Sequence, residues 1–200
     1  LVTSGGSGLD ANYTGTGTSV SSDFRFFSSN AEAMRIQAVG YTGIGTSSFD
    51  ATNPERLLVD AGVTSSYNVI SGKGDIDNYL QLNIKNSSSG TSASSDIVAT
   101  ADNGNESVNF IDMGINSSGY NNATIPILDG LDNAYVYASG NDMKIGTSSS
   151  YDVLLFTGGF ATSNERLRIT ASGNVGIGAI AIPADKLTVA GILSPSADNT

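Results

Sequence analysis

The chain has 200 residues, of which 39% are hydrophobic and only 14% are charged, and its net charge is −10. Nine Lys and Arg residues are scattered along it, which excludes a basic surface for a nucleic-acid partner. Cys and His are both absent, so disulfides, thiolate metal sites and histidine-based catalysis are excluded, and we expect no cofactor.

Twenty-four glycines, together with many Ser, Thr and Asn residues, favour β-strands and tight turns. No window keeps apolar residues at helical spacing for more than about two turns. We therefore predict an all-β chain. At its start, residues 1–23 are poor in apolar side chains, and we interpret them as a linker or the end of a preceding module.

A phrase that occurs twice marks two segments of the chain. AEAMRIQAVGYTGIG at 31–45 returns as NERLRITASGNVGIG at 164–178, and eight of the fourteen aligned positions from Glu32 onward are identical. Each copy reads as a strand, a tight turn, a strand, a loop with a proline and a further strand. We predict two short β-repeat joints, at 24–62 and 158–191.

Neither joint is large enough to be stable alone, because burial contributes about 25 cal/mol per Å² and ordering costs roughly 1.5 kcal/mol per residue. Val175 and Ile177 share one face of their strand, while the glycines leave the other face bare, so another backbone can approach closely. We expect neighbouring chains to complete the joints around a shared axis. The candidate axis residues are Ile36, Gly43, Ile44, Gly45, Ile169, Gly176, Ile177 and Gly178.

The segment between the joints, 63–157, carries several short alternating runs separated by turn residues. Such a pattern indicates a β-sandwich-like module. Residues 192–200 are interpreted as the start of a following segment. The predicted strands of the module are 66–70, 78–86, 95–101, 108–116, 133–139, 141–147 and 151–157.

Enzymatic chemistry has little support in the sequence, and we expect none. Glu32 and Glu165 occupy equivalent positions of the repeat, which indicates structural pairing with the nearby Arg residues more than catalysis by two carboxylates. The many Ser residues have no His to activate them. No glycine-rich string ends in Gly-Lys-Ser/Thr, which argues against a nucleotide site. The longest apolar runs, such as 152–156, are too short to span a bilayer.

Two acidic clusters offer oxygen ligands of the kind that Ca²⁺ takes, but neither fits a twelve-residue calcium loop. Asp and Asn also stabilise turns by accepting hydrogen bonds from their own backbone, and we favour that interpretation. The clusters consist of Asp75, Asp77 and Asn78, and of Asp102, Asn103, Asn105 and Glu106.

The repeated phrase, with DKLTVAG at 185–191, resembles a repeat of bacteriophage tail fibres and related virion fibre proteins. The middle text, from SASSDIVATADNGNESVNF to VLLFTGGFATSNERLRIT, is similar to a module of the same fibres. The resemblance covers about 30–191 and implies an elongated homotrimeric fibre segment, located in the virion. Its partners would be its own copies, other virion tail or baseplate proteins and a host cell-surface glycan or protein. Where the repeat usually continues Gly-Ile-Gly-Thr, this chain has the more apolar GIGAIAIP at 176–183.

The loop NSSGYNNAT holds the candidate receptor-binding residues. Six tyrosines fall in the middle module, and an exposed Tyr beside Asn suits contact with a glycan. Tyr120 has the best prospect of exposure, because it lies in this loop and not in a predicted strand, and Asn121 and Asn122 follow it. Two alternatives stay open: a bacterial trimeric surface adhesin or extracellular filament, and a purely structural virion decoration with no ligand.

Overall fold

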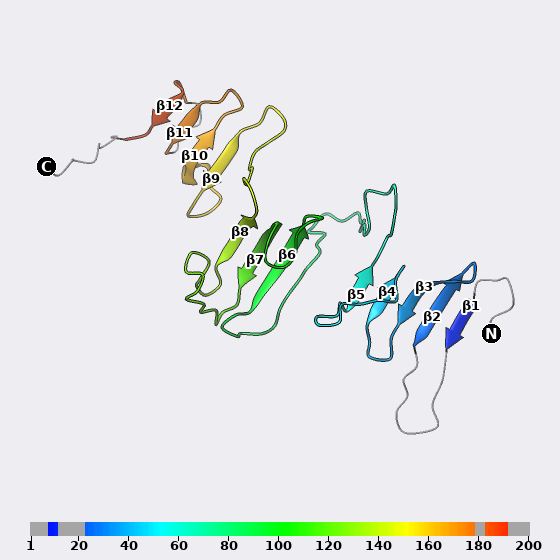
Figure 1. Ribbon diagram of the computed structural model, residues 1–200. Helices are drawn as coiled ribbons and strands as arrows, with labels where there is room; N and C mark the ends of the chain where they lie inside the picture. Colours follow the sequence, from blue (N-terminus) through cyan, green and yellow to red (C-terminus); the bar gives the residue numbers. More distant parts are fainter. Residues whose placement is uncertain (1–7, 12–22, 179–182, 192–200) are drawn as a thin grey trace. The chain divides into compact units, whose positions relative to one another are not determined.

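The fold consists of β-strands in three separate sheets (Figure 1). The computed structural model describes residues 8–11, 23–178 and 183–191. Within these ranges there is no α-helix, only the 3₁₀ turn η1 (Thr162–Asn164), and no helix that could cross a membrane. The all-β prediction is confirmed. The chain divides into two units, 1–81 and 82–200, and each sheet is described by itself.

The first sheet has the strand order β1-β2-β3-β4-β5 (Figure 1). Its neighbouring strands pair antiparallel, except that β4 and β5 are parallel. Strand β1 lies in the segment that the sequence indicated as a linker. The strands are β1 (Gly8–Ala11), β2 (Phe24–Ser28), β3 (Ala31–Ile36), β4 (Thr42–Ile44) and β5 (Leu57–Val59).

The last sheet repeats four of these strands in the order β9-β10-β11-β12. Again only the final pair, β11 and β12, is parallel. The predicted succession of strand, turn, strand, proline-containing loop and strand is confirmed in both copies. The strands are β9 (Val153–Phe156), β10 (Glu165–Ile169), β11 (Val175–Ile177) and β12 (Leu187–Val189).

The two copies agree down to single hydrogen bonds. Gly45 N donates to Ala33 O at 2.9 Å, and Gly178 N donates to Arg166 O at the same distance. The turn between β3 and β4 places Gly40 at φ 86°, and the turn between β10 and β11 places Gly173 at φ 82°. Glycine adopts that conformation without steric cost, which explains why both copies retain it.

The repeat is one strand longer than the sequence indicated. Strand β9 was predicted to belong to the middle module, but it pairs with β10 as β2 pairs with β3, and the register shifts at the same point in both pairs. The connections differ: residues 29–30 join β2 to β3, whereas residues 157–164 join β9 to β10. This difference in length conceals the correspondence when the sequences are aligned.

The middle sheet is β6-β7-β8, three antiparallel strands (Figure 1). Strands β6 (Ser94–Thr100), β7 (Phe110–Asn116) and β8 (Ala134–Ser139) confirm the predictions at 95–101, 108–116 and 133–139. No second sheet faces them in the described part of the middle segment, so the sandwich prediction is wrong for the single chain. The predicted strands 66–70, 78–86 and 141–147 are not strands. Alternation alone does not make a strand, because a ladder needs a partner.

A hydrophobic core is nearly absent from the described residues. Among the described residues whose burial is given, Tyr120 and Pro183 are the only apolar or aromatic side chains that are less than 9% exposed. The sheets are therefore held by their ladders and local contacts, while most of the large apolar side chains face outward. Because burial is the main favourable term in folding, this chain needs further surface against which to pack.

The glycines of the repeated phrase are explained by close approaches within the chain itself. A Cβ atom on Gly43 would lie 2.4 Å from Thr46 O and 3.1 Å from the Phe49 ring. A Cβ atom on Gly45, which has φ +76°, would lie 2.2 Å from Asp60 O. The backbone expected to approach the bare side of Gly43 therefore belongs to the same chain.

We predict that Gly43→Ala destabilises the first sheet by roughly 1–3 kcal/mol, the usual cost of overpacking. The Thr46 carbonyl is backbone and cannot move away cheaply. Chemical denaturation measures the change. Gly72→Ala is the matched control, because no atom lies within 4 Å of its Cβ position and its φ is not positive. Equal stability of the two variants would contradict the packing described for Gly43.

Candidate functional site

Each of the three sheets presents one apolar face to solvent. In the first sheet, the registered pairs place seven apolar side chains and one Thr on a single face. Ile44, which lies on β4 and belongs to this face, is 40% exposed. The eight residues are Phe24, Phe26, Met34, Ile36, Thr42, Ile44, Leu57 and Val59.

The last sheet has the same face, and there all eight positions are apolar. Ile177, the counterpart of Ile44, is 41% exposed. The residues are Val153, Leu155, Leu167, Ile169, Val175, Ile177, Leu187 and Val189. The four candidate axis isoleucines of the two repeats therefore lie on these faces, with exposed side chains.

The middle sheet also leaves one face apolar. Its members are paired across β6, β7 and β8, and the larger ones are about half exposed. Apolar patches of this extent on a soluble protein mark surfaces that contact another molecule. The larger side chains are those of Ile97, Ile111, Met113, Ile115 and Val136.

The opposite face of each repeat sheet carries a charge cluster, in which one Arg binds two carboxylates. In the first sheet Arg35 binds Glu32 through two hydrogen bonds of 2.7 and 2.8 Å, and binds Asp23 through one of 2.8 Å. The second copy places Arg168 between Glu165 and Asp152 in the same way. The predicted pairing of both Glu residues with Arg is confirmed.

The two aspartates were missed by the sequence interpretation. Asp23 directly precedes β2 and accepts a hydrogen bond from Ala38 N at 3.2 Å; Asp152 directly precedes β9 and accepts one from Ala171 N at 3.0 Å. Each therefore ties the start of its strand to the turn that follows the next strand. The available signal was an Asp before an apolar run in both copies, SDFRFF and YDVLLF.

One acid of each cluster has a lowered pKa. The hydrogen bond from Arg35 lowers the pKa of Glu32 from 4.5. For Asp152, the Ala171 N–H and then Arg168 lower the pKa from 3.8. An acid with a lowered folded-state pKa stabilises the fold above its unfolded pKa, and this stabilisation is lost as the pH falls through the folded value.

We predict that Arg35→Gln lowers stability at pH 7 and flattens the loss of stability between about pH 5 and pH 3. The reason is that Glu32 then titrates at nearly the same pH in the folded and unfolded states. Urea denaturation across this pH range measures it. Lys144→Gln is the control, because its pair with Asp142 is exposed and 3.9 Å long. An unchanged pH profile in Arg35→Gln would show that the cluster does not couple to folding.

The predicted receptor-binding loop lies differently from expectation. Tyr120 is 8% exposed, so the exposure predicted for it is wrong. Asn121 N donates to Thr91 O at 3.0 Å, and Asn122 Oδ1 accepts hydrogen bonds from Thr124. The loop folds back onto the sheet, and the Asn122 side chain stabilises a turn. The exposed tyrosines among the described residues are instead Tyr67, Tyr79 and Tyr151.

Under Tyr120, the polar face of the middle sheet gathers carboxylates and phenols. Ser94 Oγ donates to Asp96 Oδ2 at 2.6 Å, and the Tyr135 hydroxyl donates to Asp96 Oδ1. Gly114 lies between Asp96 and Tyr135 in the ladder, and a Cβ atom there would be 2.2 Å from Asp96 Oδ1. Glycine at this position thus allows the hydrogen bond to cross the strand.

Asp112, on the same face, leaves one carboxylate oxygen without a hydrogen-bond partner. It is 8% exposed, and its Oδ1 atom is buried without accepting a hydrogen bond. Burial, together with the nearby Asp96 carboxylate, raises the pKa of Asp112. A cavity of about 170 Å³ opens here, lined by Ser94, Asp96, Asp112, Tyr120, Ile125, Leu128, Tyr135 and Tyr137.

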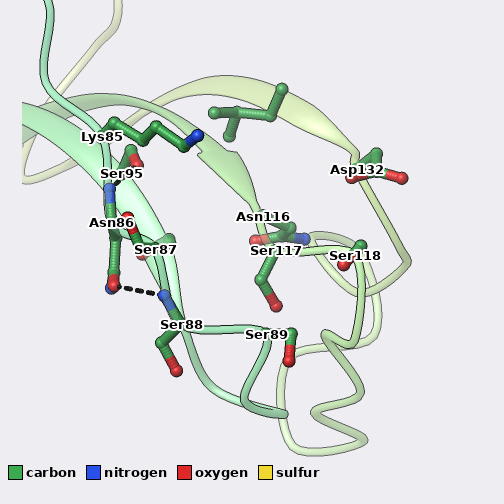
Figure 2. Close-up of a pocket in the computed structure, with 12 residues that line it drawn as sticks. Lys85, Asn86, Ser87, Ser88, Ser89, Ser95, Asn116, Ser117, Ser118 and Asp132 are labelled. Atoms are coloured by element: carbon green, nitrogen blue, oxygen red, sulfur yellow. Dashed lines mark hydrogen bonds between the residues drawn. The ribbon is translucent and has the colours of Figure 1, made fainter.

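A larger pocket of about 340 Å³, lined mainly by polar side chains together with Ile115, lies beside β6 and β7 (Figure 2). Segment 85–89 forms one wall. Asn86 N donates to Ser95 Oγ at 2.7 Å, and Ser88 N donates to Asn86 Oδ1 at 3.0 Å. The other wall holds Asn116, whose side-chain amide donates to two loop carbonyls. Hydroxyl and amide groups thus line the pocket, and Lys85 and Asp132 are the only charged residues among its lining side chains.

The acidic turns behave as turns. Asn105 Oδ1 accepts hydrogen bonds from Ser107 N and Val108 N, and Asn78 Oδ1 accepts one from Tyr79 N. Among the described residues, no group of three or more acidic side chains is placed to hold a metal ion. The turn interpretation is confirmed for these two Asn residues.

No protein-family model matches the chain, and no curated protein shows significant similarity to it.

We predict that Asp112→Asn raises the free energy of unfolding at pH 7 by about 1 kcal/mol, because it removes a buried charge whose Oδ1 atom has no hydrogen-bond donor. Asp112 has a raised folded-state pKa, so the gain disappears as the pH falls and Asp112 itself becomes neutral. Thermal and urea denaturation at pH 7 and at pH 4 measure both parts. A less stable Asn variant at pH 7 would show that the Asp112 charge is compensated in the folded protein.

Proposed function

We propose that this chain is a homotrimeric structural segment of a virion fibre of the bacteriophage tail-fibre type, which extends the fibre and supports attachment to the host. One observation carries the proposal: three sheets each leave an apolar face in solvent. Burying one side chain such as Ile or Leu contributes about 1.5–3 kcal/mol. Copies of the chain that meet around an axis would bury all three faces by repeating a single contact.

The unpaired segments support the same assembly. Residues 78–86 have the alternating pattern of a strand, and Leu80 and Leu82 are exposed. Residues 141–147 likewise leave Ile145 exposed. A neighbouring copy would provide the partner strands for these segments and close their backbone hydrogen bonds. These two of the three strand predictions that fail in one chain are thus compatible with strands between chains.

The repeat supports a fibre over a closed oligomer. One joint precedes the middle sheet in the chain and one follows it, with the same strands, the same charge cluster and the same apolar face. Joints of equal structure at both sides let modules follow each other along one axis. The resemblance of the joints and of the middle text to virion fibres names the kind of fibre, and the middle sheet is the module available for host contact.

The first test is the mass of the protein in solution by light scattering. We expect three times 20.4 kDa, about 61 kDa. Ile44→Asp combined with Ile177→Asp places a charge on two apolar faces and is expected to reduce the trimer to monomers or unfold it. Val63→Asp is the control, because Val63 is fully exposed and outside the faces.

A stable wild-type monomer would overturn the assembly, and a stable dimer would overturn the three-fold axis. Given a trimer, binding of the labelled protein to bacterial cells tests host attachment. A trimer that binds no cells among the hosts of related fibre-bearing phages would favour a structural decoration without a ligand.

A further inference from the structure

The cavity beneath Tyr120 has the character of a binding site. Its floor is the polar face of the middle sheet, with Asp96 and Asp112 on neighbouring strands and Tyr135 and Tyr137 beside them. Its roof comes from the loop after β7, through Tyr120, Ile125 and Leu128. Three phenol rings and two aliphatic side chains thus surround two carboxylates.

The hydrogen bonds show which carboxylate oxygen in the cavity lacks a donor. Both oxygens of Asp96 already accept a hydrogen bond, one from Ser94 and one from Tyr135. Asp112 is more than nine-tenths buried, lines the cavity and leaves Oδ1 without a donor. A buried acceptor without a partner costs about 1–3 kcal/mol, and more when it is charged. A ligand that brings a donor into the cavity would remove this cost.

The negative charge of the cavity indicates that its ligand is positively charged. No Lys or Arg is among the lining residues, so the two carboxylates have no basic neighbour in the cavity. A neutral hydroxyl would supply a donor but leave that charge uncompensated. A divalent metal ion needs several oxygen ligands, and Asp112 Oδ1 is the only carboxylate oxygen among the lining residues that is buried without a hydrogen bond. Ammonium groups combine positive charge, N–H donors and favourable contact with aromatic faces.

We propose that this cavity binds a primary ammonium group, held by the Asp112 carboxylate and enclosed by Tyr120, Tyr135 and Tyr137. The volume of about 170 Å³ admits a small alkylammonium head but not a large ligand. The site lies within the middle sheet and its own loop, so it stands independently of the trimer. An ammonium group of this kind is carried by an amino sugar or by a lysine side chain.

The experiment is saturation-transfer NMR on the full chain with ethylammonium chloride as the probe. We expect saturable binding with a dissociation constant in the millimolar range, at or below about 10 mM. Asp112→Asn should weaken it at least tenfold, because the charged acceptor is lost. Asp142→Asn is the matched control, since Asp142 is exposed and is not among the lining residues. Circular dichroism verifies the fold of both variants.

Neutral 1-propanol, of similar size, keeps the result interpretable if Asp112→Asn does not fold. It should neither bind nor displace ethylammonium. Glucosamine and Nα-acetyl-lysine amide then distinguish the two sources of the ammonium group. No saturable signal with ethylammonium up to about 50 mM, an equal signal from 1-propanol, or unchanged binding by a folded Asp112→Asn variant would each overturn the proposal.

Discussion

The exposed apolar face of each sheet is the constraint on which the rest of the structure depends. Strand ladders satisfy the backbone, but a sheet gains most of its stability from covering one face. In the described residues the larger apolar side chains stay outside, Ile44 and Ile177 among them, and the only buried aromatic residue is Tyr120. In the proposed trimer, association would complete this packing, and assembly would then belong to folding more than to a later step.

The charge clusters decide which face is left for association. Arg35 and Arg168 each bind two carboxylates on the side of the sheet that carries no Ile. The aspartate of each cluster also accepts a hydrogen bond from the turn between β3 and β4, or between β10 and β11. Loop residues approach the same side at Gly43. In the first joint this side is therefore partly covered by the chain itself, whereas in the last joint Leu154 and Phe156 on the same side stay exposed beside Arg168.

The middle sheet differs from the two repeat sheets, because its polar face buries a carboxylate oxygen that accepts no hydrogen bond. Asp112 Oδ1 is buried without a donor. Because Gly114 has no Cβ atom, the Tyr135 hydroxyl can reach Asp96 across the strand. Proteins usually retain such local conflicts where a site is needed. The loop that carries Tyr120 covers this face, so binding and the shape of the loop are coupled through one side chain.

The sequence by itself determined the all-β class, the two repeats with their strands, and the Glu–Arg pairs, because these follow from alternation, glycine turns and a spacing of three residues. Tertiary structure alone decided the rest. Asp23 and Asp152 lie 12 and 16 residues from their Arg partners, and the connection after β9 is longer than the one after β2. Segment 78–86 has the pattern of a strand but pairs with no strand among the described residues. Tyr120 is buried because its loop folds back over β7, and contacts between residues remote in sequence depend on chain path, which local pattern does not specify.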